Sequence, residues 1–167
     1  ADASAVKMCY SAINKGTQGL WLEVMIAAKR LGVDGLLEKQ LRSSRSELVD
    51  FILGQFPSIT PKAYRWVPEM IEISKTLSAA GIGPKVFQGE ADIFQFVAGT
   101  ALGKETPENR DKSRTGKDVI EQLKKGGSVS QRRIFAAAPA DSFPSRWACS
   151  TRCNTSSVIP MCESLQC

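Results

Sequence analysis

The sequence predicts an all-α protein, a helical bundle of about five to seven helices built on one long N-terminal helix, with an irregular C-terminal tail. The first observation is the stretch from Ala3 to about Leu31, which is rich in apolar residues and contains no proline. The second is a series of helix start and stop signals along the rest of the chain. The third is the scarcity of the alternating pattern that half-buried strands show.

The first predicted helix ends at Gly32. Glycine readily takes the left-handed conformation of helix C-termini, and Lys29 and Arg30 place positive charge in the last turn. Gly16 and Gly19 lie inside this helix, where each costs roughly 1 kcal/mol relative to alanine. We therefore expect another element to pack closely against both glycines.

Two short helices are predicted next, one from Asp34 through Leu41 and one that begins at Ser46 and runs through Leu53. Both starting residues are good N-caps, because their side-chain oxygens accept hydrogen bonds from free backbone N–H groups. Thr60-Pro61 then predicts the start of a longer helix, since proline is favoured at the first helical position.

That longer helix is expected to end at Gly81, with Pro68 inside it as a bend or a lost backbone hydrogen bond. Pro84 predicts the start of another helix. A last amphipathic helix is predicted from Lys117 to Leu123, after a charged connector and before the Gly126-Gly127 pair.

The character of the chain changes after Gly127. Residues 1–127 read as one helical domain, whereas residues 128–167 read as a tail that lies outside the helical core. Four of the five cysteines are in this tail: Cys149, Cys153, Cys162 and Cys167. Free thiols, disulfides and a zinc site are all compatible with this spacing, and unstructured free thiols without a metal are our expectation.

The composition restricts the function. The chain contains no histidine, which excludes Ser-His-Asp and Cys-His catalysis and mixed zinc sites. Its 22 basic and 17 acidic residues are interspersed, so the net charge of +5 does not predict a nucleic-acid partner. The chain shows neither a membrane-spanning run nor a signal-peptide pattern, and we expect a cytoplasmic protein.

Polar residues form one stripe on the first predicted helix. Ser4, Lys7, Ser11, Asn14 and Gln18 follow one another at spacings of three and four residues, which places them on one helix face. The stripe is either the solvated side of an amphipathic helix or the lining of a cleft. A lysine in such a cleft can remove the hydroxyl proton during oxidation of an alcohol, provided that the lysine is neutral.

Two segments of the sequence resemble a known superfamily. The run ASAVKMCYSAINKG, residues 3–16, resembles the start of the interdomain helix in 6-phosphogluconate and 3-hydroxyisobutyrate dehydrogenases, and Lys7 matches the catalytic lysine of that helix. The run PKAYRWVPEMIEI, residues 61–73, is similar to phosphogluconate-dehydrogenase-like proteins with a C-terminal domain of unknown function. The resemblance covers residues 1–123.

The resemblance implies the helical C-terminal domain of an NAD(P)-dependent β-hydroxyacid dehydrogenase. Lys7 would be the catalytic base, and Ser4, Ser11, Asn14 and Lys15 would bind the substrate, a small hydroxy acid that in some members is phosphorylated. NADP or NAD would bind mainly to a nucleotide-binding domain that is absent from this chain. The family also implies a homodimer, with no nucleic-acid or membrane partner.

This sequence departs from the family pattern in three places. Ser11 stands where the superfamily has an asparagine, and Glu69-Met70 stands where many members have a Lys-Asp pair near the cofactor. The G-x-G-x-x-G fingerprint that follows a strand is also absent, because Gly81-Ile82-Gly83 follows a helix. We therefore do not expect this chain to be active alone. The alternative function is a non-catalytic helical dimerisation or protein-interaction module derived from such an enzyme.

Overall fold

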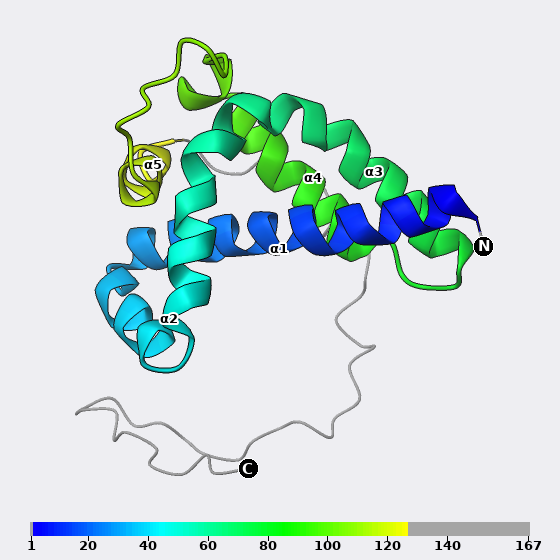
Figure 1. Cartoon of the computed structure of the whole chain (residues 1–167), viewed down its shortest axis with the longest axis horizontal. Coiled ribbons are helices and arrows are strands. Elements are labelled where there is room, and N and C mark those ends of the chain that lie inside the picture. The colour runs from blue at the N-terminus through cyan, green and yellow to red at the C-terminus, as the bar shows by residue number, and fades with distance from the viewer. Residues whose placement is uncertain (1, 127–167) are drawn as a thin grey trace, which may run out of the picture. The chain divides into compact units, whose positions relative to one another are not determined.

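The computed structural model describes residues 2–126, and this part of the chain is all-α, as predicted (Figure 1). The predicted tail and its four cysteines lie outside the described residues. The helices and 3-10 turns in chain order are α1 (Ala3–Leu31), α2 (Asp34–Ile59), η1 (Thr60–Lys62), α3 (Ala63–Ala79), α4 (Lys85–Ala98), η2 (Leu102–Lys104) and α5 (Gly116–Leu123).

The ends of α1 follow from local chemistry. The Asp2 carboxylate accepts a hydrogen bond from the Ser4 backbone nitrogen at 2.9 Å, which caps the first turn. Gly32 adopts a left-handed conformation with φ of 73° and ends the helix, as predicted. Lys29 in the last turn pairs with Asp34 at 2.8 Å and thereby links α1 to the start of α2.

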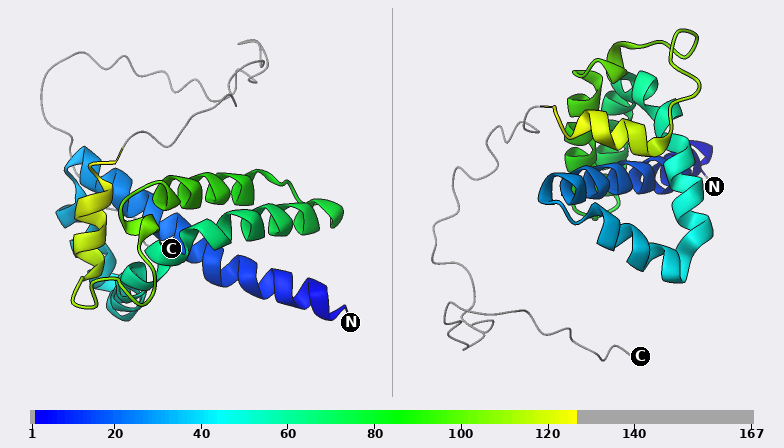
Figure 2. Two further views of the ribbon diagram at one scale, coloured as in Figure 1. Left: turned by 90° about the horizontal axis from the view of Figure 1, so that it is seen from above. Right: turned by 90° about the vertical axis from the view of Figure 1, so that its left-hand side faces the viewer.

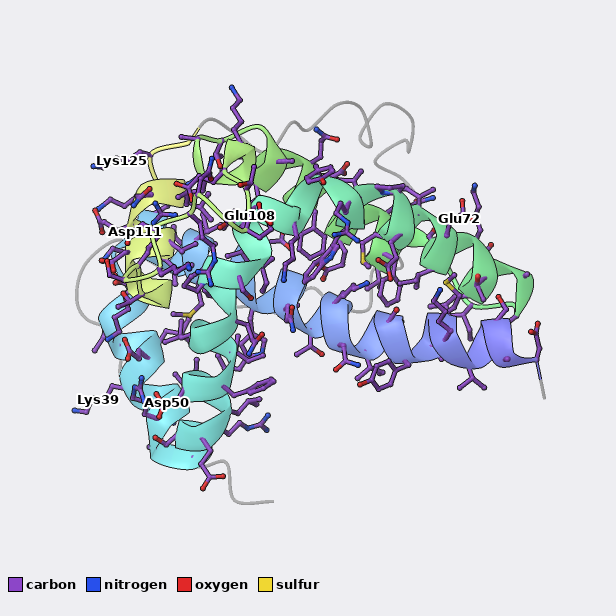
Figure 3. The ribbon with its side chains drawn as sticks, turned by 45° about the horizontal axis from the view of Figure 1, so that its top comes forward. Lys39, Asp50, Glu72, Glu108, Asp111 and Lys125 are labelled. Atoms are coloured by element: carbon purple, nitrogen blue, oxygen red, sulfur yellow. The ribbon has the colours of Figure 1, made fainter. Side chains whose placement is uncertain are left out.

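The two helices predicted after Asp34 are present as the two arms of α2, which meet at a kink, and both arms are longer than predicted. The backbone of α2 leaves helical geometry at Arg45, directly before the predicted cap Ser46. Arg42 bridges the kink, since its guanidinium pairs with Glu38 on one side at 2.8 Å and with Asp50 on the other at 2.7 Å. Figure 3 shows Asp50 on the arm of α2 that follows the kink.

Helices α3 and α4 lie side by side and are joined by a turn in which Gly81 has φ of 80° (Figures 1 and 2). The Ser74 hydroxyl on α3 donates to the Pro84 carbonyl at 3.1 Å, which fixes the start of α4. The predicted helix start at Thr60-Pro61 proves to be η1, and α3 itself begins two residues later. Pro68 lies inside α3, with its ring exposed.

Helix α1 packs against all four other α-helices. Gly16 and Gly19 of α1 face α4, and the close packing that was predicted for both glycines is confirmed. A Cβ atom on Gly16 would lie 2.9 Å from the Phe87 ring, and one on Gly19 would lie 1.7 Å from the Glu90 carboxylate. The shared core centres on fully buried side chains that include Leu22, Phe56 and Phe94.

Helix α5 begins with a reciprocal cap. The Thr115 hydroxyl accepts from the Asp118 backbone nitrogen at 3.3 Å, and the Asp118 carboxylate accepts from the Thr115 backbone nitrogen at 2.8 Å. We expect Thr115→Ala to lower the free energy of unfolding by about 1 kcal/mol, measured by chemical denaturation. An unchanged denaturation midpoint would show that the cap does not stabilise the helix.

Candidate functional site

A groove of about 350 Å³ opens between α1 and the segment that joins α2 to α3. Helix α1 contributes polar side chains to one wall, and α2, η1 and α3 contribute the other. The lining residues are Tyr10, Ser11, Asn14, Lys15, Gln18, Gln55, Ser58, Ile59, Lys62 and Trp66. Hydroxyl, amide and ammonium groups are thus combined with two aromatic rings, a set that suits a small polar ligand.

Lys15 is held in place within this groove. Its ammonium forms an ion pair with Glu69 of α3 and lies 5.4 Å from the centre of the Trp66 ring. Trp66 is itself fixed by an edge-to-face contact with Phe94, with ring centres 5.1 Å apart. Lys15 is therefore held in one position, and the Glu69 carboxylate already neutralises much of its positive charge.

Lys62 is the second cation of the groove. It is partly buried and has no ion pair or hydrogen bond with another of residues 2–126. Gln18, on the opposite wall, has a buried Oε1 atom without a hydrogen-bond partner among the described residues. Since unpaired buried polar groups are costly, these two groups favour a ligand that is anionic and carries hydrogen-bond donors.

The structure brings some of the predicted site residues together and leaves others apart. Ser11, Asn14 and Lys15 line the groove. Ser4 and Lys7 are exposed and are not part of its lining, because they lie toward the amino end of α1, beyond the segment that faces α2 and η1. Lys7 precedes Ser11 by about one helical turn along α1.

The sequence interpretation missed an apolar face on the outside of α1. We call this face the outer seam, and its members are Val6, Tyr10, Ile13, Leu20, Val24 and Leu31, all of them exposed. A shallow depression of about 590 Å³ lies along its first half, lined by Ala5, Val6, Cys9, Tyr10, Ile13 and Asn14. The spacing of four and three residues between these apolar positions was the available signal.

A buried carboxyl group was also missed. Glu90 on α4 is 6% exposed, and its Oε2 atom has no hydrogen-bond partner among the described residues. Burial, together with the nearby Glu23 carboxylate, raises the pKa of Glu90 to about 8. A glutamate between the apolar residues Phe87 and Phe94 was the sequence signal for this site.

Two classes of site find no support within residues 2–126. No group of three or more acidic or cysteine side chains there is arranged to hold a metal ion. No helix in that range is both long and apolar enough to cross a membrane.

Comparison with known proteins gives one finding. Residues 28–97 match a family model described as a domain of unknown function (DUF1932). Neither the curated proteins nor the solved structures gave a match. The matched range extends from the last turn of α1 to the end of α4 and contains the segment 61–73, whereas Lys7 precedes it. Over residues 28–97 the chain is therefore similar to this domain family.

Proposed function

We propose that this chain is the substrate-binding and dimerisation domain of an NAD(P)-dependent β-hydroxyacid or phosphogluconate-like dehydrogenase. The observation that carries the proposal is the groove, which unites Ser11, Asn14 and Lys15 about one helical turn from Lys7. The match to a domain of unknown function supports it, because the segment 61–73 resembles a dehydrogenase subgroup that carries such a domain. The same proposal places the protein in the cytoplasm.

The groove supplies the groups that such a substrate needs. Lys62 would attract the carboxylate or phosphate of a hydroxy acid, because of the two cations in the groove it is the one without an ion pair to another of residues 2–126. The Ser11 hydroxyl and the Asn14 amide would orient the substrate hydroxyl groups. The Asn14 amide is itself oriented, since its Nδ2 donates to the Tyr10 carbonyl at 3.0 Å.

Lys7 would take the proton from the substrate hydroxyl. When bound, NAD or NADP accepts the hydride that leaves the adjacent carbon. A lysine can act as this base only when it is neutral, and Lys7 is exposed in the helical domain by itself. The proposal therefore requires a nucleotide-binding domain, or a second subunit, that covers the amino end of α1 and removes water from this amine.

The test uses this chain together with its nucleotide-binding domain. We expect Lys7→Met to lower the rate of hydroxy-acid oxidation at least about 100-fold, because it removes the base and retains most of the side chain. Cofactor binding should not change. The matched control is Lys39→Met, since Lys39 is an exposed lysine on α2, remote from the groove (Figure 3). Turnover that survives in the Lys7 variant would rule out the assigned role.

A second candidate is a non-catalytic dimerisation module derived from such an enzyme. The outer seam favours it, because this apolar face continues along α1 well beyond Lys7. Turnover with NADP and NAD separates the two candidates. A protein that still dimerises, yet oxidises no hydroxy acid when a nucleotide-binding domain and either cofactor are added, is the module and not the enzyme.

A further inference from the structure

We propose that Glu69 restricts the groove to small hydroxy acids with a single negative charge and thereby selects against phosphorylated ones. The inference rests on the proposed function, because it names the substrate class of the same groove. Its basis is the balance of charge between α1 and the segment that joins α2 to α3. Two lysines line the groove, and a carboxylate from α3 is already paired with one of them.

The ion pair between Lys15 and Glu69 is a fixed part of the groove. The two side chains are only 25% and 26% exposed, so water and salt screen this pair less than a pair on the open surface. The Lys15 ammonium also lies 5.4 Å from the centre of the Trp66 ring, and that ring is held edge-to-face against Phe94. The positive charge of Lys15 is therefore largely compensated before a ligand binds.

Lys62 is the cation that receives the ligand. Of the two lysines in the groove, it is the one without an ion pair to another of residues 2–126. None of the residues that line the groove is acidic, so the two ammonium groups and the Glu69 carboxylate leave one positive charge in excess. A single carboxylate on the ligand balances this charge and accepts a charge-assisted hydrogen bond from Lys62.

A second anionic group on the ligand finds no such partner. A phosphoryl group adds about 1.5 to 2 negative charges near neutral pH. In a groove of about 350 Å³ it would lose water without gaining a cation, and the Glu69 carboxylate would repel it. Gln18 acts in the same direction, because its buried Oε1 atom lacks a hydrogen-bond donor among the described residues. A ligand hydroxyl can donate to this atom, whereas an ionised phosphate oxygen cannot.

NMR titrations of the full chain with glycerate and with 3-phosphoglycerate test this selection, because the two probes differ only in the phosphoryl group. We expect the wild-type chain to bind glycerate more tightly than 3-phosphoglycerate. Glu69→Gln removes the negative charge but keeps the shape of the side chain and an oxygen that accepts from Lys15. This variant should shift the ratio of the two dissociation constants at least about tenfold in favour of 3-phosphoglycerate. Lys62→Met should weaken glycerate binding at least about tenfold.

The matched control is Glu72→Gln, the same change about one turn further along α3, where Glu72 is exposed and pairs with Lys75 (Figure 3). This variant should keep the wild-type ratio. Weaker binding of both probes by Glu69→Gln would mean that Glu69 only holds Lys15 in place, and would overturn the inference. A wild-type chain that binds neither probe, or that prefers 3-phosphoglycerate, would also overturn it.

The inference and the proposed function can fail separately. The expected shift in Glu69→Gln, found in a protein whose Lys7→Met variant retains turnover, would contradict the catalytic assignment alone. Turnover that depends on Lys7, found together with an unchanged ratio in Glu69→Gln, would contradict the charge selection alone.

Discussion

Gly116→Ala will lower the free energy of unfolding by about 2–3 kcal/mol. Gly116 is buried at the first position of α5, where the helix meets the backbone of α2. A Cβ atom there would lie 2.2 Å from the Leu53 carbonyl oxygen and 2.9 Å from its carbonyl carbon. Because these are backbone atoms inside a helix, the clash cannot be relieved by a side-chain rotation. Helix α5 must move away from α2, and Val119 and Leu123 would then lose core contacts.

The matched control is Gly54→Ala, one residue after Leu53. Gly54 is exposed in the interior of α2, and a Cβ atom there would have no neighbour within 4 Å. Alanine should therefore stabilise the chain by up to about 1 kcal/mol through helix propensity. Chemical denaturation of both variants measures the difference. If Gly116→Ala is as stable as Gly54→Ala, α5 does not pack against α2 in the way the structure shows.

The all-α fold and most helix boundaries were predictable because each depends on a few neighbouring residues. Gly32 ends α1, and Thr60-Pro61 opens a new helical segment, through backbone preferences that the local sequence determines. The break within α2 was predictable from the cap signal at Ser46, but the contact that joins its two arms was not. Its two arms are joined by Arg42, whose charged partners Glu38 and Asp50 lie on opposite sides of the kink, and this depends on their arrangement in space.

The candidate site was predictable only in part. The spacing of polar residues in α1 identifies a polar stripe on the helix. It does not show which part of that stripe lies against another helix. Ser11 and Asn14 lie in the groove and Lys7 does not, because Gln55 and Lys62 reach α1 from segments far away in the sequence. Lys62 was missed for the same reason.

The outer seam was missed because apolar residues at helical spacing are usually assigned to the core. Helix α1 has two apolar faces, and one sequence cannot show which of them the rest of the bundle covers. The glycines of α1 indicate the buried face better than its apolar residues do. Gly16 and Gly19 mark the buried face, since α4 approaches there too closely for a side chain. Val6 and Val24, on a different side of the helix, are consequently left exposed.

Glu90→Gln will stabilise the chain at alkaline pH and have little effect in acid. In the folded chain the pKa of Glu90 is raised from its ordinary value of 4.5 to about 8, first by burial and then by Glu23. Between these two pH values the folded state keeps a proton that the unfolded state has released. The stability that the neutral carboxyl contributes is therefore complete below about pH 4.5 and is lost as the pH rises through about 8.

Glutamine keeps the shape of the neutral carboxyl and cannot ionise. The gain from Glu90→Gln should therefore grow from near zero at about pH 5 to on the order of 3 kcal/mol at about pH 9. Thermal unfolding across this range measures it, with Glu72→Gln as the control because Glu72 is exposed on α3 (Figure 3). Glu23→Gln should recover a smaller share of the gain, since it removes the weaker of the two causes. Equal pH profiles for the wild type and Glu90→Gln would mean that this carboxyl is hydrated, and that α1 and α4 do not meet as closely at Gly19 as the structure shows.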